Sequence, residues 1–408
     1  MIKSAKFIVA TLILLTALAL SSCADKCRGD AELSPQSDTD AVETIENDTT
    51  ETEETTMPIY EEVPHVYNTD SVYYQYADES AANLIANYWY KPGKIFYDGY
   101  PKQRSSAFNY WWYAHAIDVM ADAYIRTKDE SYITYIDDIV DTIVKRNKKI
   151  TNDYYDDMEW MALALLRMYD ETKDEKYLDN VQILWNDIKT GWNDTMGGGI
   201  AWRKEQLTYK NTPANAPAAI LAARLYKVTK DEADLEWAVK IYDFQKANLV
   251  DPSSGQVWDG INRENNGKID KNWNFTYCHG VYIGAGVELY KITGDETYLA
   301  DAKKTAAYAL IQFTDERRGT FKSEGDGDGG LFKGILIRYL TQLYKVAPEM
   351  VEIKETIIKN ADILRDKGTN AEGNFTNTFF LAPKDGNGSD LSTQLSGCML
   401  FEAAAYMD

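Results

Sequence analysis

A four-residue pattern, Thr-(Lys/Gly)-Asp-Glu, recurs along this chain and separates segments whose apolar residues have helical spacing. Asp or Thr at such positions caps the start of a helix, and acidic residues in a first turn suit the helix dipole. The pattern therefore predicts pairs of helices joined by short turns. The copies are Thr127–Glu130, Thr172–Glu175, Thr229–Glu232 and Thr293–Glu296, with Val346–Glu349 as a degenerate fifth.

The segments between these turns favour helices over strands. In two of these segments the apolar spacing places one stripe inward. The residues are Val281, Ala285, Val287, Leu289 and Tyr290 in 277–292, and Leu299, Ala302, Ala306, Ala307 and Leu310 in 298–312. No alternating β-branched run is long enough for a regular strand, although short strands fit the glycine-rich loops. The connections at the other end of each pair, 191–217, 251–275 and 314–331, are long. We therefore predict an all-α fold, an (α/α)6 barrel, or toroid, of about six hairpins with long loops on the active-site face.

The N-terminal region has the composition of a targeting segment followed by a tether. Residues 1–22 combine a basic start with an apolar run too short for a membrane span, which indicates a signal peptide. The run ends at Leu20-Ser21-Ser22-Cys23, which resembles a bacterial lipobox and predicts lipidation of Cys23. An ordinary secretory signal with a chance cysteine is the alternative. Residues 23–63 form an acidic stretch with too few apolar residues to fold, and 64–408 form one domain.

A formal net charge of −21 argues against nucleic acid and anionic lipid as partners. It is compatible with a neutral ligand such as a glycan. We expect a monomer that touches a membrane only through the lipid on Cys23. The expected location is the bacterial outer membrane, at the cell surface or the periplasmic face.

The cysteines and histidines indicate neither a metal site nor a cofactor. The chain has four cysteines and three histidines, and none of them clusters with metal-ligand spacing. A Ser-His-Asp triad is disfavoured, although His115 and His279 stay open as single candidates. Asp326 and Asp328 resemble a calcium loop, but Ile337 stands where an EF-hand requires glutamate.

Asp156 and Asp157 are neighbouring carboxylates among aromatic residues, at the start of a strongly helical run. Like charges a few ångströms apart raise one pKa and leave the other group ionised. A protonated acid beside a carboxylate is the pair that glycosidic bond cleavage requires. The alternative is a capping pair that only stabilises the helix dipole. Because their helix leads to the turn at Thr172, both aspartates should lie on the long-loop face.

Aromatic, amide and carboxylate side chains converge on that face if the hairpins alternate as predicted. Aromatic faces stack on sugar rings, while amides and carboxylates bind hydroxyl groups. The alternative places tryptophans such as Trp111 and Trp112 in the helix core. The candidate substrate-binding residues are Trp112, Trp202, Asn215, Trp258, Asp259, Tyr277 and Asp328.

Several motifs in order resemble glycoside hydrolase family 76, the endo-α-1,6-mannanases, from about residue 80 to the C-terminus. The first is Tyr154-Tyr155-Asp156-Asp157 with Trp160. The others are Trp192 with Gly197–Trp202, Asn215, Asp259-Gly260-Ile261, Phe275-Thr276-Tyr277 with Gly280-Val281, and Phe332-Lys333-Gly334 with Arg338-Tyr339-Leu340. The chain departs from the family at Cys278-His279, where relatives more often carry Asn-Gln, so details of the sugar subsites are open.

The resemblance implies an (α/α)6 barrel and metal-free, retaining hydrolysis of α-1,6-linked mannan. By matching position, it implies that Asp156 is the nucleophile, Asp157 the acid/base, and Asp259 a ligand of sugar hydroxyls. Two other classes stay open: a non-catalytic glycan-binding surface lipoprotein on the same scaffold, and another (α/α)6 sugar-active enzyme such as an epimerase or uronyl hydrolase. Epimerases of this kind rely on histidines, which are scarce here.

Overall fold

The computed structural model describes residue 60, residues 64–103 and residues 108–408. The predictions for the signal peptide, for Cys23 and for most of the acidic tether fall outside these residues. Thr56–Asp408 forms one compact unit. Everything below concerns the described residues of that unit.

The described residues form twelve α-helices and two pairs of two-residue antiparallel strands, so the all-α prediction is confirmed. The strands are β1 (Trp89–Tyr90) with β2 (Ile95–Phe96), and β3 (Lys210–Asn211) with β4 (Gly260–Ile261). The helices are α1 (Val72–Tyr88), α2 (Tyr110–Thr127), α3 (Ser131–Asn147), α4 (Tyr155–Thr172), α5 (Glu175–Lys189), α6 (Ala216–Thr229), α7 (Glu232–Leu249), α8 (Thr276–Thr293), α9 (Glu296–Phe313), α10 (Gly329–Val346), α11 (Val351–Ile363) and α12 (Leu391–Met407).

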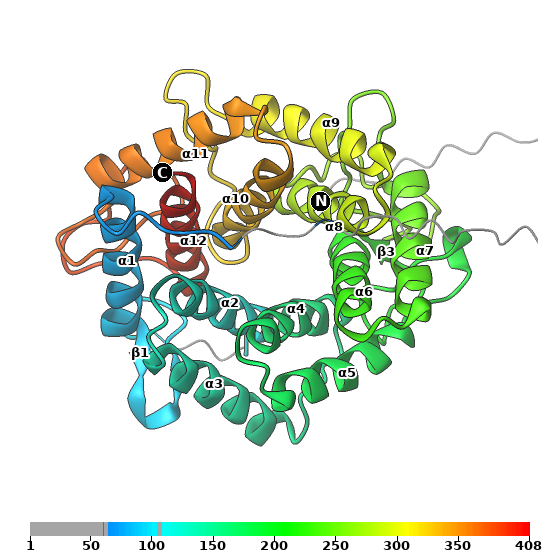
Figure 1. Cartoon of the computed structure of the whole chain (residues 1–408), viewed down its shortest axis with the longest axis horizontal. Coiled ribbons are helices and arrows are strands. Elements are labelled where there is room, and N and C mark those ends of the chain that lie inside the picture. Colours follow the sequence, from blue (N-terminus) through cyan, green and yellow to red (C-terminus); the bar gives the residue numbers. More distant parts are fainter. Residues whose placement is uncertain (1–59, 61–63, 104–107) are drawn as a thin grey trace, which may run out of the picture. The chain divides into compact units, whose positions relative to one another are not determined.

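The helices form two concentric rings (Figure 1). The inner ring consists of α2, α4, α6, α8, α10 and α12, and each of these helices packs against the next. The inner helices α8 and α12 are buried on nearly every side, whereas the outer helices α3 and α5 bury a single stripe. The predicted (α/α)6 barrel is confirmed. Its sixth pair is formed by α1 and α12, from the two ends of the domain, rather than by a hairpin.

The predicted turns have a repeated hydrogen-bonding pattern. At the turn between α4 and α5, Lys173 adopts the left-handed conformation with φ 55° and ends α4. The hydroxyl of Thr172 accepts from the backbone N–H of Asp174 at 3.2 Å, and the Asp174 carboxylate accepts from the N–H of Lys176 at 3.1 Å. Lys128, Lys230 and Gly294 adopt the same conformation at the equivalent places. The prediction of capped, short turns is confirmed for these four copies. The degenerate fifth, Val346–Glu349, is short but has neither the left-handed residue nor a side-chain cap on α11.

These turns fix the direction of every inner helix. Each inner helix ends at the short-turn end of the barrel, or with the chain, and therefore begins at the opposite end. The connections at that opposite end are mostly long, such as 190–215, 250–275, 314–328 and 369–390. With 18 residues, α4 is about 27 Å long. The first turn of α4 thus lies on the long-loop face, far from the short turns, as predicted.

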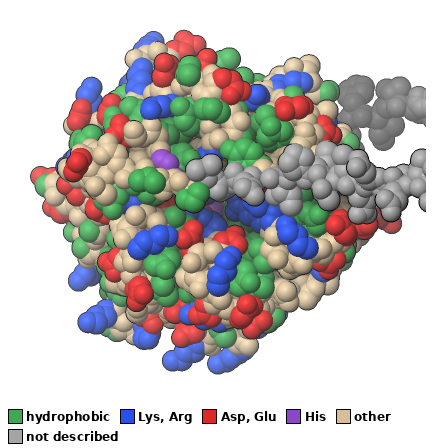
Figure 2. Space-filling model, in the orientation of Figure 1, with side chains coloured by type: hydrophobic (Ala, Val, Ile, Leu, Met, Phe, Trp, Pro, Cys, Tyr) green, Lys and Arg blue, Asp and Glu red, His purple; other side chains and the backbone are tan. Residues whose placement is uncertain are grey.

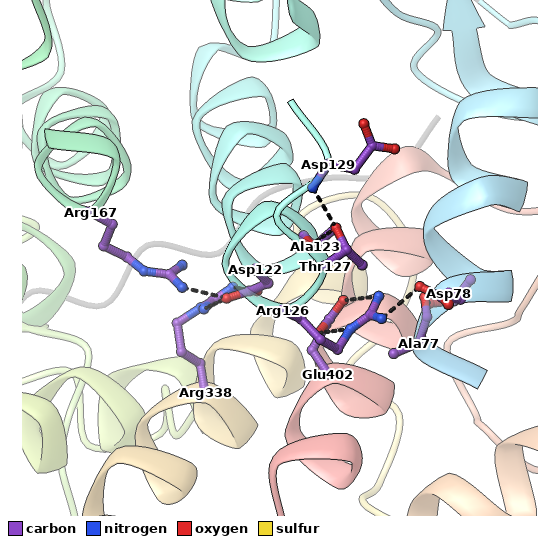
Figure 3. A network of polar contacts seen from close by, with 11 residues as sticks. Ala77, Asp78, Asp122, Ala123, Arg126, Thr127, Asp129, Arg167, Arg338 and Glu402 are labelled. Carbon is purple, nitrogen blue, oxygen red and sulfur yellow. Dashed lines mark hydrogen bonds and ion pairs between the residues drawn. The ribbon is translucent and has the colours of Figure 1, made fainter. Parts of the chain in front are cut away.

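Buried and partly buried ion pairs tie the inner helices together in the half of the barrel near the short turns (Figure 3). The carboxylate of Asp122 on α2 accepts from Arg167 of α4 at 2.5 Å and from Arg338 of α10 at 2.6 Å. Arg126 of α2 binds Glu402 of α12 at 2.9 Å. Removing one partner of such a pair leaves a buried charge, which costs about 3–5 kcal/mol. This network therefore closes the ring around α2.

A hollow of about 1020 Å³ lies at the short-turn end, and its lining includes Arg167, Arg338 and Lys173. Tyr60 also lines it, and its backbone N–H donates to the carbonyl of Lys291 at 2.9 Å. The described start of the domain thus lies at the end of the barrel opposite the first turn of α4.

Acidic and basic side chains are interspersed over the face seen in Figure 2. In the part of the chain that the structure describes, no helix has both the length and the apolar character that a membrane span needs.

Candidate active site

Asp156 and Asp157 occupy the first turn of α4 on the long-loop face, and both are partly buried. The indole N–H of Trp202 donates to the Asp156 carboxylate at 3.1 Å. The side-chain amide of Asn152 donates to Asp157 at 2.6 Å. The backbone N–H of Asp157 donates to the other oxygen of Asp156 at 3.0 Å. Each carboxylate therefore has its own donor, and the two are held in different settings.

These settings separate the proton affinities of the two groups. Burial raises the pKa of Asp156 to about 7, and the hydrogen bonds from Asp157 and Trp202 oppose that rise. Burial raises the pKa of Asp157 well above its usual range, and the charges of Asp156 and Asp328 raise it further. Near neutral pH Asp156 ionises first while Asp157 keeps its proton, which yields one carboxylate and one acid.

The loop that carries Trp202 is fastened to the start of α4. The Tyr155 N–H donates to the Trp202 carbonyl at 3.0 Å, and the Trp202 N–H donates to the Tyr209 carbonyl at 3.1 Å. At Gly199, φ is +90° and a Cβ atom would lie 2.4 Å from the Phe244 ring, so the loop requires glycine there. The predicted site residue Trp202 thus lies beside the nucleophile candidate.

Asp259 is nearly buried, and hydroxyl and guanidinium groups surround its carboxylate. The hydroxyls of Tyr277 and Tyr209 each donate to it at 2.9 Å, and Arg263 donates at 2.5 Å. Its charge nevertheless raises the pKa of Asp156. Asp259 and Tyr277 therefore lie on the same face as Asp156.

Asp328 and Trp112 also belong to this face. One oxygen of Asp328 accepts from the indole N–H of Trp112 at 3.0 Å and from that of Trp111 at 3.2 Å. Trp112 is largely buried, whereas Trp111 is partly exposed. The carboxylate thus fixes both indoles beside the charge that acts on Asp157.

Two of the predicted sugar-binding residues, Asn215 and Trp258, are buried and hydrogen-bond to other parts of the protein. Asn215 is fully buried, and its side-chain amide donates to the carbonyls of Ile200 and Asn211 and accepts from the Ile200 N–H. The expected direct contact between Asn215 and a sugar is therefore corrected: the amide shapes the loop that carries Trp202. Trp258 is 9% exposed, and its carbonyl accepts from Thr212.

The two histidines left open by the sequence are both buried. His279 accepts from the Val257 N–H at 3.0 Å through Nε2, and its Nδ1 lies 2.8 Å from the Phe275 carbonyl. Burial lowers its pKa to about 4 and that of His115 to about 3, so both rings are neutral. His279 fastens the 250–275 loop to α8. The histidine at this position, where the family more often carries a different residue, therefore helps to position that loop.

Sequence reasoning did not identify several residues of this face. Asn152, Tyr209 and Arg263 are donors to the site carboxylates, and Glu159 is fully buried one turn after Asp156 with no protein partner for either oxygen. Asn152 and Arg263 lie 5 and 4 residues from the carboxylates they bind, whereas Tyr209 lies 50 residues from Asp259, and their residue types alone did not mark these roles. In the described residues, no group of three or more His, Cys, Asp or Glu side chains is arranged to hold a metal.

A model of the glycosyl hydrolase family 76 matches residues 73–408, which covers the whole barrel. The chain belongs to glycosyl hydrolase family 76. This finding confirms the predicted family.

Solved structures of family 76 proteins resemble this chain along most of its length. One is an inactive variant of an α-1,6-mannanase from Salegentibacter sp. HEL1_6, in which two neighbouring aspartates are replaced by alanine, in complex with α-1,6-mannotetrose. It is 41% identical with a TM-score of 0.78, and the match covers 83% of this chain and 100% of that one. The Lin0763 protein from Listeria innocua is 38% identical with a TM-score of 0.76, covering 82% and 97%.

A curated relative is a putative mannan endo-1,6-α-mannosidase of Schizosaccharomyces pombe. It is 26% identical over 272 residues, which is 60% of this family 76 chain and 61% of the relative. The chain thus spans about three fifths of the length of the curated relatives it matches.

Proposed function

We propose that this family 76 chain hydrolyses α-1,6-mannosidic linkages in α-mannan polysaccharide or oligosaccharide, with retention of configuration. The observation that carries the proposal is the placement of Asp156 and Asp157 side by side in the first turn of α4, each with its own side-chain hydrogen-bond donor. The α-1,6-mannanase relative, whose variant lacking two neighbouring aspartates is inactive, supports the same reaction.

In the first step, Asp157 donates its proton to the glycosidic oxygen as the bond to the anomeric carbon breaks. A carboxylate oxygen of Asp156 attacks that carbon and forms a glycosyl ester. The leaving part of the chain departs as a neutral alcohol. The raised pKa of Asp157 supports its role as the acid, and the Trp202 hydrogen bond supports the ionised state of Asp156.

In the second step, Asp157 is a carboxylate and accepts a proton from water as the water attacks the anomeric carbon. The ester to Asp156 breaks and releases its carboxylate. Two displacements at one carbon return the original configuration. The loss of the Asp156 charge in the ester lowers the pKa of Asp157, which suits its change from acid to base.

Asn substitutions at the pair test this assignment. We expect Asp156→Asn and Asp157→Asn to cleave α-1,6-mannotetraose at least a thousandfold more slowly, with unchanged thermal unfolding. Added azide should give an α-mannosyl azide with Asp157→Asn and an aryl mannoside that has a good leaving group. The matched control is Asp138→Asn, because Asp137 and Asp138 are also adjacent but lie on outer helix α3.

The outcomes separate the competing classes. Near-normal turnover by either Asn variant contradicts the roles of the pair. Binding of mannan by the wild-type protein without hydrolysis supports the glycan-binding alternative. Hydrolysis of a glucan or uronan in place of mannan supports another sugar-active enzyme.

We further propose that the chain is a monomeric bacterial lipoprotein, acylated on Cys23 and held at the outer membrane. The lipobox-like Leu20-Ser21-Ser22-Cys23 supports this. The wild-type protein should incorporate a fatty-acid label and sediment with membranes, whereas Cys23→Ala should do neither. Light scattering of the detergent-solubilised protein that gives twice the chain mass would contradict the monomer.

A further inference from the structure

Four partly or fully exposed aromatic residues form a continuous band on the long-loop face. We call Trp111, Phe332, Phe275 and Trp273 the aromatic band. Ring centroids lie 6.3 Å apart between Trp111 and Phe332, 5.2 Å between Phe332 and Phe275, and 5.8 Å between Phe275 and Trp273. The band starts at the indole that donates to Asp328 and extends away from it to the 250–275 loop.

Trp273 is the outer end of the band and the most exposed of the ten tryptophans. Trp273 is 45% exposed. Isolated exposed apolar residues need no explanation. Trp273 differs because it continues a row of aromatic rings that reaches the catalytic face.

Trp273 is held in place by the network around Asp259. The backbone carbonyl of Trp273 accepts from the backbone N–H of Asp259 at 3.2 Å, and the backbone N–H of Trp273 donates to the Asp270 carbonyl at 2.9 Å. The guanidinium of Arg263 lies 3.9 Å from the centre of its ring, and Arg263 is bound by the carboxylates of Asp259 and Asp270. A ring braced on one face loses little freedom when a ligand covers the other face.

We propose that Trp273 is a stacking platform for a mannose unit away from the bond that is cleaved, and that it sets the preference for longer chains. This inference rests on the proposed function. An indole face matches the apolar C–H face of a sugar, and its remaining exposure is the area that such a unit covers.

The spacing places this unit beyond the reacting one. From Trp202, which touches Asp156, the contacts run to Tyr209 at 6.0 Å between ring centres, then to Arg263 at 4.6 Å, and then to Trp273 at 3.9 Å. Trp273 is therefore separated from the nucleophile by three intervening side chains. We therefore assign a sugar stacked on Trp273 to the same chain, at a position away from the reacting atoms.

The test measures kcat/KM on α-1,6-mannosyl oligosaccharides of increasing length. Trp273→Ala should lower kcat/KM on the hexasaccharide about tenfold, chiefly through KM, and leave the shortest cleaved substrate within about twofold. Trp273→Phe should recover most of the loss, because it restores a ring. The matched control is Ile311→Ala, which removes an apolar side chain that is 81% exposed on outer helix α9.

The outcomes distinguish this inference from the proposed function. If Trp273→Ala cleaves the hexasaccharide as well as the wild type, or loses activity equally at every length, the platform is refuted while mannan hydrolysis stands. If the wild type cleaves none of these oligosaccharides, the proposed function fails and the inference fails with it.

Discussion

Replacing Trp202 with phenylalanine tests how the protein keeps Asp156 ionised. The substitution retains an aromatic ring against Tyr154 and Tyr209 but removes the indole N–H that donates to Asp156 at 3.1 Å. A hydrogen bond to a charged group contributes about 1.5–3 kcal/mol. We take the lower value, because both side chains are partly exposed. One pKa unit corresponds to about 1.4 kcal/mol, so the pKa of Asp156 should rise by about one unit.

The direction of the pKa shift depends on which protonation state of Asp156 the hydrogen bond stabilises. The indole binds the ionised carboxylate, so its loss favours the protonated form and moves the pKa upward from about 7. In the proposed mechanism Asp156 must be ionised to attack, and the acidic limb of kcat/KM would report that ionisation in the free enzyme. The limb should move about one pH unit higher, and activity at pH 6 should fall about tenfold more than activity on the plateau.

Trp185→Phe is the matched control. The Trp185 indole N–H also donates to an aspartate, Asp234, at 2.8 Å, but this bond joins outer helices α5 and α7. Its loss should lower the free energy of unfolding by about 1 kcal/mol and leave the acidic limb unchanged. The reasoning is refuted if Trp202→Phe leaves the limb where it is, or if both variants move it equally.

Three further substitutions test the electrostatics and the packing. Asp328→Asn removes a charge that raises the pKa of Asp157, so the basic limb of kcat/KM should move to lower pH; an unmoved limb would contradict the coupling. Glu159 is fully buried, and burial together with the charge of Asp156 raises its pKa well above its usual range. An unfolded glutamate ionises near pH 4.3, so the wild type should lose stability relative to Glu159→Gln as pH rises from there towards the folded pKa, by about 1.4 kcal/mol per unit. Urea unfolding at pH 5 and 7 measures the difference in free energy of unfolding between the wild type and Glu159→Gln. An equal difference at both pH values would show that Glu159 is ionised in the folded protein and would contradict the prediction. Gly284→Ala places a Cβ atom 2.3 Å from the Tyr339 ring, so it should cost about 1–3 kcal/mol in urea unfolding although alanine normally stabilises a helix.

Local chemistry made the helix boundaries predictable. In the turn at Thr172, the hydroxyl, the left-handed Lys173 and the capping Asp174 act within four residues of each other. No distant part of the chain is required, so the sequence pattern carries the whole signal. The same turn order fixed the end of the barrel at which Asp156 lies.

The composition of the site was harder to predict. Asn215 has the residue type of a sugar ligand, yet its amide binds the backbone of the connection that leads into its own helix, at Ile200 and Asn211. Arg263 and Tyr209 have no distinctive local pattern, yet both donate to Asp259. Such roles depend on which groups the folded chain brings together, whether the partner lies 4 residues away, as Asp259 does from Arg263, or 50, as it does from Tyr209, and residue type alone does not contain that information.

By itself, the sequence determined the helical pairs, their direction and the face on which Asp156 and Asp157 lie, because caps and apolar spacing act over a few residues. The tertiary structure decided the closure of the ring by α1 and α12, the burial that raises both pKa values, and the donor that each carboxylate receives. Those properties arise from low dielectric surroundings and from contacts between distant segments, which exist only once the barrel has formed.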